Sequence, residues 1–257
     1  MATVTVNAMS QPANGERGAA PDPIGCVQRW SLGVVLATLA VFLVVMGSRF
    51  TLASLAGLAG EPVLSKLRDA LPVTAHEAEG LLAAKQGELK WRANGEAAID
   101  AGLARLLIAE SLPADEKNRA HLVSAAVTDL KQGLMATPLS GRGWARLAYG
   151  LAALEGWSAA AQTALQFSIA AAPFEPSLMP FRLRMGFQAW PTLDARGRAA
   201  VLQQVRYAAK VDLRSLVLLA GQERAFPVVR AALRDEPHVL AEFERLRTQS
   251  ASDRQRG

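Results

Sequence analysis

The stretch GLMATPLSGRGWARLAYGLAALEG, residues 133–156, places a helix-favouring segment between two helix-breaking signals. Pro138 ends the segment before it, because proline lacks an amide donor and its ring clashes with the preceding turn. Gly156 is typical of the position just past a helix C-terminus. Alanine, leucine and arginine dominate the residues between them, and these have high helix propensity. The stretch therefore predicts the end of one helix and the whole of the next.

Helix-breaking signals of the same kind recur along the chain from about Thr74. Runs of β-branched residues and strand-like alternation are absent, and the pieces between breaks are about 12 to 20 residues long, which is usual for globular helices. The breaks fall at Asn94-Gly95, Pro113, Pro138, Gly156, Pro173, Pro176, Pro191 and Pro237. We predict an all-α chain of helical hairpins over 74–220, C-terminal helices over 221–247 and a disordered tail over 248–257.

A spaced pattern in this region repeats after 35 residues. It reads Ala126-x3-Leu130-x2-Gly133-x4-Pro138 and then Ala161-x3-Leu165-x2-Ser168-x4-Pro173. The small residues at positions 126, 133, 161 and 168 would let two helices of a hairpin approach closely, and the proline would stop the second helix. Between the copies lie Trp144, Leu147 and Leu151, with the large side chains expected to fill the groove to the next hairpin.

This pattern resembles the tetratricopeptide repeat, whose first helix carries W-x2-L-G-x2-Y and whose second carries A-x3-F-x2-A-x4-P. The resemblance covers about residues 122–173 and departs from the family in having Ala148 and Leu151 at the Gly and Tyr positions. The wider stretch is similar to bacterial membrane-anchored repeat proteins associated with cell-surface polysaccharide assembly. A generic array of alanine- and leucine-rich hairpins is the alternative.

An apolar run, SLGVVLATLAVFLVVMG at 31–47, has no charged residue. With its flanks it approaches the roughly 30 Å hydrocarbon core of a bilayer. Trp30 and Phe50, beside Arg29 and Arg49, are typical of membrane interfaces. We predict a disordered leader over 1–28, a transmembrane helix over 29–50 and a linker or interfacial segment over 51–73. A cleaved signal peptide is the alternative, but its best small-x-small sites lie well beyond the run.

The charges that flank the run nearly cancel, so they do not decide its orientation. We expect a single pass of the bacterial inner membrane with the N-terminus in the cytoplasm and the helical domain in the periplasm, because long downstream domains translocate largely regardless of charge. The membrane is therefore one expected partner, and the sequence fixes no oligomeric state.

No motif for chemistry stands out. His76, His121 and His238 lie on separate predicted elements, and Cys26 is the one cysteine, so no metal-ligand spacing is present. Phosphate-loop, nucleophile-elbow and dinucleotide motifs are also absent from the sequence. The carboxylates of TAHEAE and PADE are typical of helix caps. We expect no catalytic residue, no metal and no cofactor, and therefore a protein that is not an enzyme.

A basic stretch runs from Phe181 to Arg214. It holds seven Lys or Arg residues against two Asp, an excess that equals the net charge of +5 of the whole chain. Arg182, Arg184 and Arg206, with Tyr149 from the preceding hairpin, are the candidate partner-binding residues. The expected partner is another envelope protein, with an anionic glycan or a lipid phosphate as further options and no nucleic acid. A solvated helix face is the alternative for this stretch.

These features predict a non-enzymatic, membrane-tethered scaffold or adaptor that binds a partner protein in the bacterial cell envelope, with surface polysaccharide assembly or export as the implied pathway. The alternative is an envelope enzyme or glycan-handling protein that acts on cell-surface polysaccharide.

Overall fold

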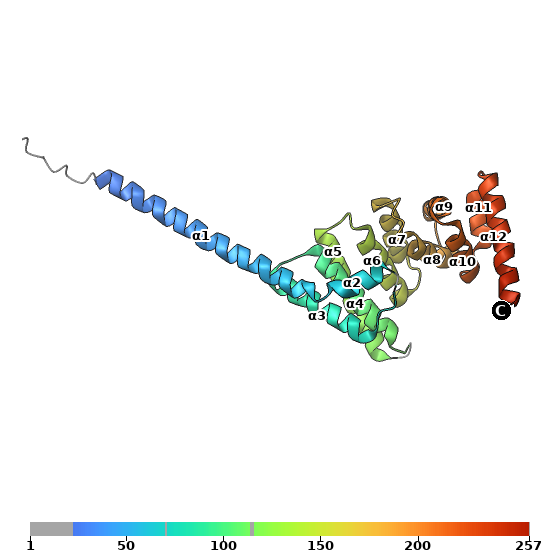
Figure 1. Ribbon diagram of the computed structural model, residues 1–257, viewed down its shortest axis with the longest axis horizontal. Helices are drawn as coiled ribbons and strands as arrows, with labels where there is room; N and C mark the ends of the chain where they lie inside the picture. Colours follow the sequence, from blue (N-terminus) through green and yellow to red (C-terminus); the bar gives the residue numbers. More distant parts are fainter. Residues whose placement is uncertain (1–22, 70, 114–115, 257) are drawn as a thin grey trace, which may run out of the picture. The chain divides into compact units, whose positions relative to one another are not determined.

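The computed structural model describes the backbone of residues 23–69, 71–113 and 116–256, and the side chains of these residues except 23–31, 251 and 253–256. Across this part of the chain the secondary structure is entirely helical, as predicted (Figure 1). The helices are α1 (Pro23–Leu58), α2 (Glu61–Arg68), α3 (Ala75–Trp91), α4 (Gly95–Ser111), α5 (Lys117–Ala136), α6 (Gly141–Glu155), α7 (Ala159–Ala171), α8 (Met179–Ala189), α9 (Ala195–Val211), α10 (Leu213–Gln222), α11 (Phe226–Leu233) and α12 (Pro237–Arg256). The chain divides after Ser48 into two compact units.

Helix α1 begins in the first unit and ends in the second. Within the described residues, Leu32–Leu58 is long and apolar enough to cross a membrane, with a mean hydropathy of 2.1 and none of its most apolar window buried. This confirms the predicted N-terminal apolar helix. The helix begins at Pro23, so residues 23–28 of the predicted disordered leader are helical; proline suits a first helical position, where no amide donor is needed. Residues 1–22 and the side chains of Arg29 and Trp30 lie outside the described residues.

The second unit begins at Arg49. Much of the predicted linker over 51–73 is helical, because no proline or glycine conformation breaks α1 before Leu58 and Pro62 then begins α2 favourably. The start of α3 agrees with the sequence prediction. Thr74 accepts a hydrogen bond from the amide of Glu77, whose carboxylate accepts one from the amide of Thr74.

Three hairpins, α4–α5, α6–α7 and α8–α9, follow one another in chain order (Figure 1). Small residues bring the first pair close together. A Cβ on Gly133 would lie 2.7 Å from the Gly95 carbonyl oxygen, and one on Gly102 would lie 2.6 Å from Leu130 Cγ. The predicted breaks at proline, glycine and Asn-Gly all fall between helices or at their ends.

The repeat positions divide into buried and exposed sets. The buried ones are Ala126, Leu130, Gly133, Leu147, Leu151, Ala161, Leu165 and Ser168. Pro138 and Pro173 are exposed just after α5 and α7. Trp144 is only partly buried, contrary to the expectation that it fills an inter-hairpin groove. Its indole packs on Phe167, with 4.9 Å between the ring centroids, and donates to the Pro138 carbonyl at 2.8 Å.

The apolar core of the second unit is in two main parts. One lies between α4, α5, α6 and α7 around Ile99 and Leu130, and the other between α8 and α12 around Leu233 and Phe243. The tail predicted to be disordered over 248–257 is wrong as far as Arg256, where α12 ends. The tail contains no proline and no glycine before Gly257, and the hydroxyls of Thr248 and Ser250 donate to carbonyls four residues earlier.

Candidate functional site

Arg182 was expected on a binding surface, but its side chain is 1% exposed. It extends from α8 to the C-terminus of α7, where Nε donates to Ser168 Oγ at 2.9 Å, Nη1 to the Ala172 carbonyl at 2.7 Å and Nη2 to the Ser168 carbonyl at 2.6 Å. Burial lowers the pKa of Arg182 to about 10, and nearby Glu175 partly offsets the shift. Arg182 is therefore a capping residue for the unpaired carbonyls of a helix end, which corrects the sequence prediction.

Ser168 occupies the position that Gly133 holds in the first copy of the repeat. In the α4–α5 hairpin the equivalent Gly133 lies directly against the Gly95 carbonyl. In the α6–α7 hairpin the Ser168 hydroxyl donates to the Gly141 carbonyl at 2.7 Å and accepts from Arg182. The two copies of the repeat thus differ where their helices approach closely: the first has no side chain at this position, and the second has a hydroxyl that hydrogen-bonds across the contact.

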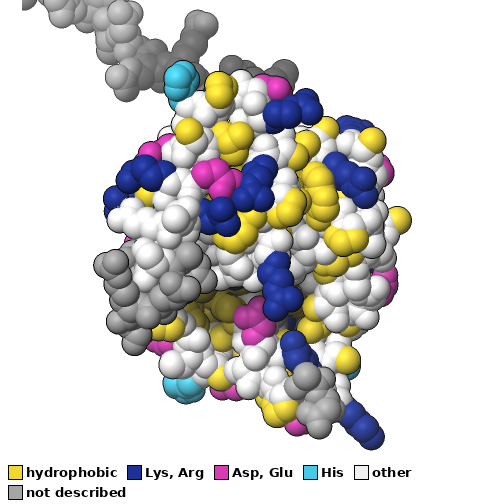
Figure 2. Space-filling view, turned by 90° about the vertical axis from the view of Figure 1, so that its right-hand side faces the viewer, with side chains coloured by type: hydrophobic (Ala, Val, Ile, Leu, Met, Phe, Trp, Pro, Cys, Tyr) yellow, Lys and Arg dark blue, Asp and Glu magenta, His cyan; other side chains and the backbone are white. Residues whose placement is uncertain are grey.

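Arg206 is also engaged within the fold. Its Nε donates to the Ala232 carbonyl at 2.9 Å in the last turn of α11, and its Nη1 donates to Gln203 at 3.3 Å. Lys and Arg side chains on the face that carries the C-terminal helices are scattered among acidic and apolar ones (Figure 2). The basic stretch therefore does not form one binding surface, because two of its three candidates cap helices.

A long groove lies instead along the first helices of the three hairpins. Three adjoining hollows of about 340, 370 and 510 Å³ share Arg142 and Leu178, and we call their union the inner groove. Helix α2 borders it through Leu64, Leu67 and Arg68, and α4, α6 and the start of α8 form the rest. Its apolar lining includes Leu107 and Phe181.

The charges along the inner groove are balanced. Four arginines and five carboxylates line it: Arg68, Arg142, Arg146, Arg184, Glu61, Glu96, Asp100, Glu110 and Glu175. Arg142 pairs with Glu96 at 3.0 Å, and Arg146 with Asp100 at 2.8 Å. Since opposite charges already neutralise one another here, the groove is not a trap for an anion.

A buried ionic network supports the middle of the inner groove. Lys85 on α3 is 6% exposed, and its Nζ lies 3.9 Å from Asp100 and 3.3 Å from Glu88. Asp100 also receives Arg146, whose pKa is lowered by burial and partly restored by Asp100. Removing one member of such a network leaves a buried charge without compensation, so Arg146 is held in a fixed position.

Tyr149 and Arg184 are the two candidate residues that the structure does bring together. Both line the same hollow, where the Tyr149 ring packs on Phe181 with 5.7 Å between centroids. Burial, followed by a hydrogen bond to Glu110, raises the pKa of Tyr149 to about 12. Arg184 is half exposed and lies 3.3 Å from Glu223. This end of the groove therefore offers an apolar floor with a phenol and a guanidinium at its edge.

Sequence reasoning named Tyr149 of α6 but missed the other residues that this helix contributes. Arg142, Ala145, Arg146 and Tyr149 follow the i, i+3, i+4, i+7 spacing of one helix face, and all four line the inner groove. That spacing could have identified them.

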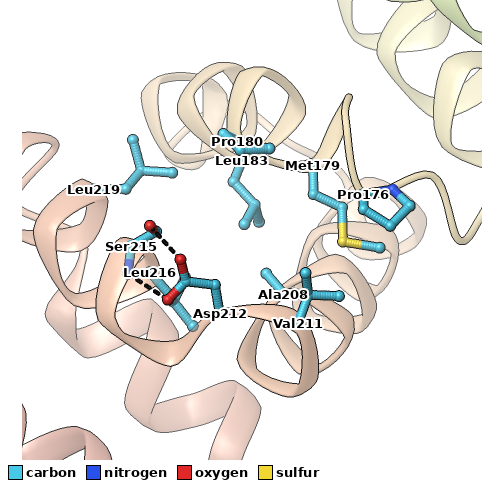
Figure 3. Close-up of a pocket in the computed structure, with 10 residues that line it drawn as sticks. All are labelled: Pro176, Met179, Pro180, Leu183, Ala208, Val211, Asp212, Ser215, Leu216 and Leu219. Carbon is cyan, nitrogen blue, oxygen red and sulfur yellow. Dashed lines mark hydrogen bonds between the residues drawn. The ribbon is translucent and has the colours of Figure 1, made fainter. Parts of the chain in front are cut away.

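A second, smaller cleft lies between α8, α9 and α10 (Figure 3). Its volume is about 60 Å³, and Met179, Leu183, Val211 and other apolar residues line it. Its one carboxylate, Asp212, accepts from the amide and hydroxyl of Ser215 and caps α10. The carboxylate is thus used within the fold, and the space suits no more than a single apolar side chain.

Groups of three or more His, Cys, Asp or Glu side chains that could hold a metal do not occur among the residues described. His76, His121 and His238 lie on α3, α5 and α12 respectively, far apart in the sequence and on different helices. The inner groove offers apolar contacts and hydrogen-bonding groups to a bound molecule. No protein-family model matches the chain, and neither a curated protein nor a solved structure shows significant similarity to it.

Proposed function

We propose that this protein is a non-enzymatic, membrane-tethered adaptor of the bacterial cell envelope that holds a segment of a partner protein in the inner groove. The observation that carries the proposal is the convergence of α4, α6 and α8 on one groove with an apolar floor and a charged rim. Arrays of helical hairpins use such inner surfaces to bind extended or helical peptides.

The lining favours a protein segment over an anionic glycan or a lipid phosphate. Leu107 and Phe181 offer contact to apolar side chains, while the arginines at the rim already have carboxylate partners. A polyanion would have to displace those carboxylates, whereas an amphipathic segment with mixed charges would not. The tetratricopeptide-like pattern and the link to surface polysaccharide assembly belong to this proposal, as do the inner-membrane location and the periplasmic placement of the helical domain.

Binding can be tested with the full chain purified from detergent-solubilised membranes. Leu107→Asp and Arg184→Glu change the groove, whereas Leu218→Asp and Arg196→Glu change exposed residues elsewhere. We expect the amount of co-purified partner to fall at least tenfold in both groove variants, which corresponds to a loss of about 1.4 kcal/mol in binding free energy. The amount should be unchanged in both controls. Equal recovery in all four variants would exclude the inner groove as the binding site.

The remaining alternative, an enzyme that acts on surface glycan, predicts a different result. The purified full chain would then release reducing ends from cell-surface polysaccharide in the absence of any partner. We expect no release above that of a heat-unfolded control.

A further inference from the structure

The part of α1 that belongs to the second unit has one covered face and one open face. Ala53 and Gly57 are buried, and a Cβ on Gly57 would lie 2.7 Å from the Glu88 carboxylate of α3. On the opposite side of the helix Leu52, Leu55 and Leu58 are 39%, 59% and 60% exposed. Their three-residue spacing makes an uncovered apolar ridge on this part of α1.

The last turn of α3 brings aromatic and cationic groups to the same place. Arg49 Nε donates to the Trp91 carbonyl at 3.1 Å, and the Arg92 guanidinium lies 4.4 Å from the centroid of the Phe50 ring. Phe50 is 49% exposed and Trp91 is 42% exposed. The Phe50 ring is therefore held by an arginine, and both rings are partly exposed.

Among the residues that the structure describes, the cations at this place have no carboxylate partner. Arg49, Lys90 and Arg92 are exposed, and none of the ion pairs in the described part of the chain includes them. Glu88, the acid of the same turn, has a side chain only 14% exposed and pairs with Lys85. The local charge is thus positive.

Helix length relates this surface to the bilayer. The segment Leu32–Leu58 has 27 residues, which span about 40 Å at 1.5 Å per residue. The hydrocarbon core is about 30 Å thick and the headgroup regions extend the bilayer to about 40–45 Å. The excess of about 10 Å corresponds to the two turns after Arg49, which would lie at headgroup depth.

We propose that the protein makes a second membrane contact, in which α3 as well as α1 binds the lipid surface. The residues that form this contact are called the interfacial corner and are Arg49, Phe50, Leu52, Leu55, Leu58, Lys90, Trp91 and Arg92. Aromatic rings and arginines are enriched at the depth of the headgroups, and long cationic side chains reach phosphate while their stems stay in apolar surroundings. The three unpaired cations specify anionic lipids as the preferred surface. This contact is independent of the inner groove.

The experiment uses the full chain in nanodiscs, with nitroxide labels on single cysteines. Cys26 is the one native cysteine, so Cys26→Ser gives a background free of other thiols. Labels are placed by Leu43→Cys in the apolar run, Leu55→Cys and Ala93→Cys in or beside the interfacial corner, and Leu218→Cys on exposed α10. Collision with oxygen, which enriches in lipid, is compared with collision with a water-soluble nickel chelate.

We expect the labels at 43, 55 and 93 to favour oxygen and the label at 218 to favour nickel. Adding phosphatidylglycerol to phosphatidylcholine discs should shift the label at 93 further toward oxygen. Arg92→Glu should abolish that shift, whereas Arg196→Glu, at an exposed arginine on α9, should not.

Three outcomes would overturn the proposal. In the first, the labels at 55 and 93 are as accessible to nickel as the label at 218 while position 43 stays in lipid. In the second, the label at 55 shows dipolar broadening that disappears on dilution with unlabelled chain, which would identify a second copy as the occupant. In the third, position 43 itself favours nickel, which would exclude the membrane anchor as well.

Discussion

Replacing Arg182 by alanine should destabilise the second unit far more than replacing Arg184, although the two lie one residue apart in the basic stretch. Arg182 is 1% exposed and makes three hydrogen bonds of 2.6–2.9 Å at the end of α7. Hydrogen bonds from a charged donor contribute about 1.5–3 kcal/mol each, and each buried carbonyl left without a partner costs about 1–3 kcal/mol. Arg184 makes one half-exposed ion pair with Glu223, and such pairs contribute about 0–1 kcal/mol.

Adding these contributions would overestimate the stabilisation by Arg182, because burying its charge costs free energy. That cost is visible in its pKa, which burial lowers to about 10. The unfolded guanidinium also regains hydration. We therefore expect the free energy of unfolding to fall by about 3–5 kcal/mol in Arg182→Ala, a range that also includes the cavity left behind. Arg184→Ala should lose less than about 1 kcal/mol.

The measurement is urea unfolding of the full chain in detergent, followed by circular dichroism at 222 nm and by tryptophan fluorescence. Arg182→Lys serves as a second control, since it keeps the charge but one ammonium cannot reach acceptors in three directions; its loss should be intermediate. Equal stability of Arg182→Ala and Arg184→Ala would refute the capping role and restore Arg182 as a surface residue.

Further outcomes follow from other contacts. Gly133→Ala should destabilise by about 1–3 kcal/mol in the same assay, because its Cβ would clash with α4; Gly80→Ala, whose Cβ meets nothing within 4 Å, should be neutral or stabilising. Trp144→Ala should lower the free energy of unfolding by about 2 kcal/mol, which is less than the loss on truncating a fully buried tryptophan, because the ring is only partly buried. A loss above about 4 kcal/mol would contradict its partial exposure. A hydrogen bond from Lys66, followed by bonds from the Thr74 cap, lowers the pKa of Glu77 from its ordinary 4.5 to about 2, so the stabilisation is complete above about pH 4.5 and is lost as the pH falls toward 2. The protection factors of the α2 amides, which are corrected for the intrinsic pH dependence of hydrogen exchange, should fall as the pH falls through that window, and Glu77→Gln should remove this change.

The helices could be predicted from the sequence because their boundaries are set by local chemistry. Pro138, Gly156 and the Thr74 cap act within one or two turns of their own position, so each break is visible in a short window. The break at Asp212 was harder to find, since aspartate is a strong cap only where the backbone has already left the helix. The tail over 248–257 was predicted to be disordered because chain ends are often poorly ordered, although position at the end of a chain does not stop a helix that lacks glycine and proline as far as Arg256.

The site could be predicted only in part, because the destination of an arginine depends on its tertiary surroundings. The sequence around Arg182 and Arg184 does not show which of the two is buried. Arg182 is buried because its guanidinium reaches Ser168 on the neighbouring helix. Tyr149 and Arg184, two of the candidates named from the sequence, line one hollow because they lie on the first helices of neighbouring hairpins. The charge balance of the groove could not be foreseen, because Glu96 and Glu110 come from a hairpin outside the basic stretch.

Side chains of one hairpin that cap helices of another affect how the second unit unfolds. Arg182 of α8 completes α7, Gln204 of α9 donates to the Pro173 carbonyl that follows α7, and Arg206 completes α11. In a hairpin array, cooperativity depends on the free energy of contacts between neighbouring units. Here the α7 terminus cannot open without exposing polar groups of α8 and α9. Native-state hydrogen exchange should therefore find one opening free energy shared by the α6–α7 and α8–α9 hairpins, and Arg182→Ala should split it into two.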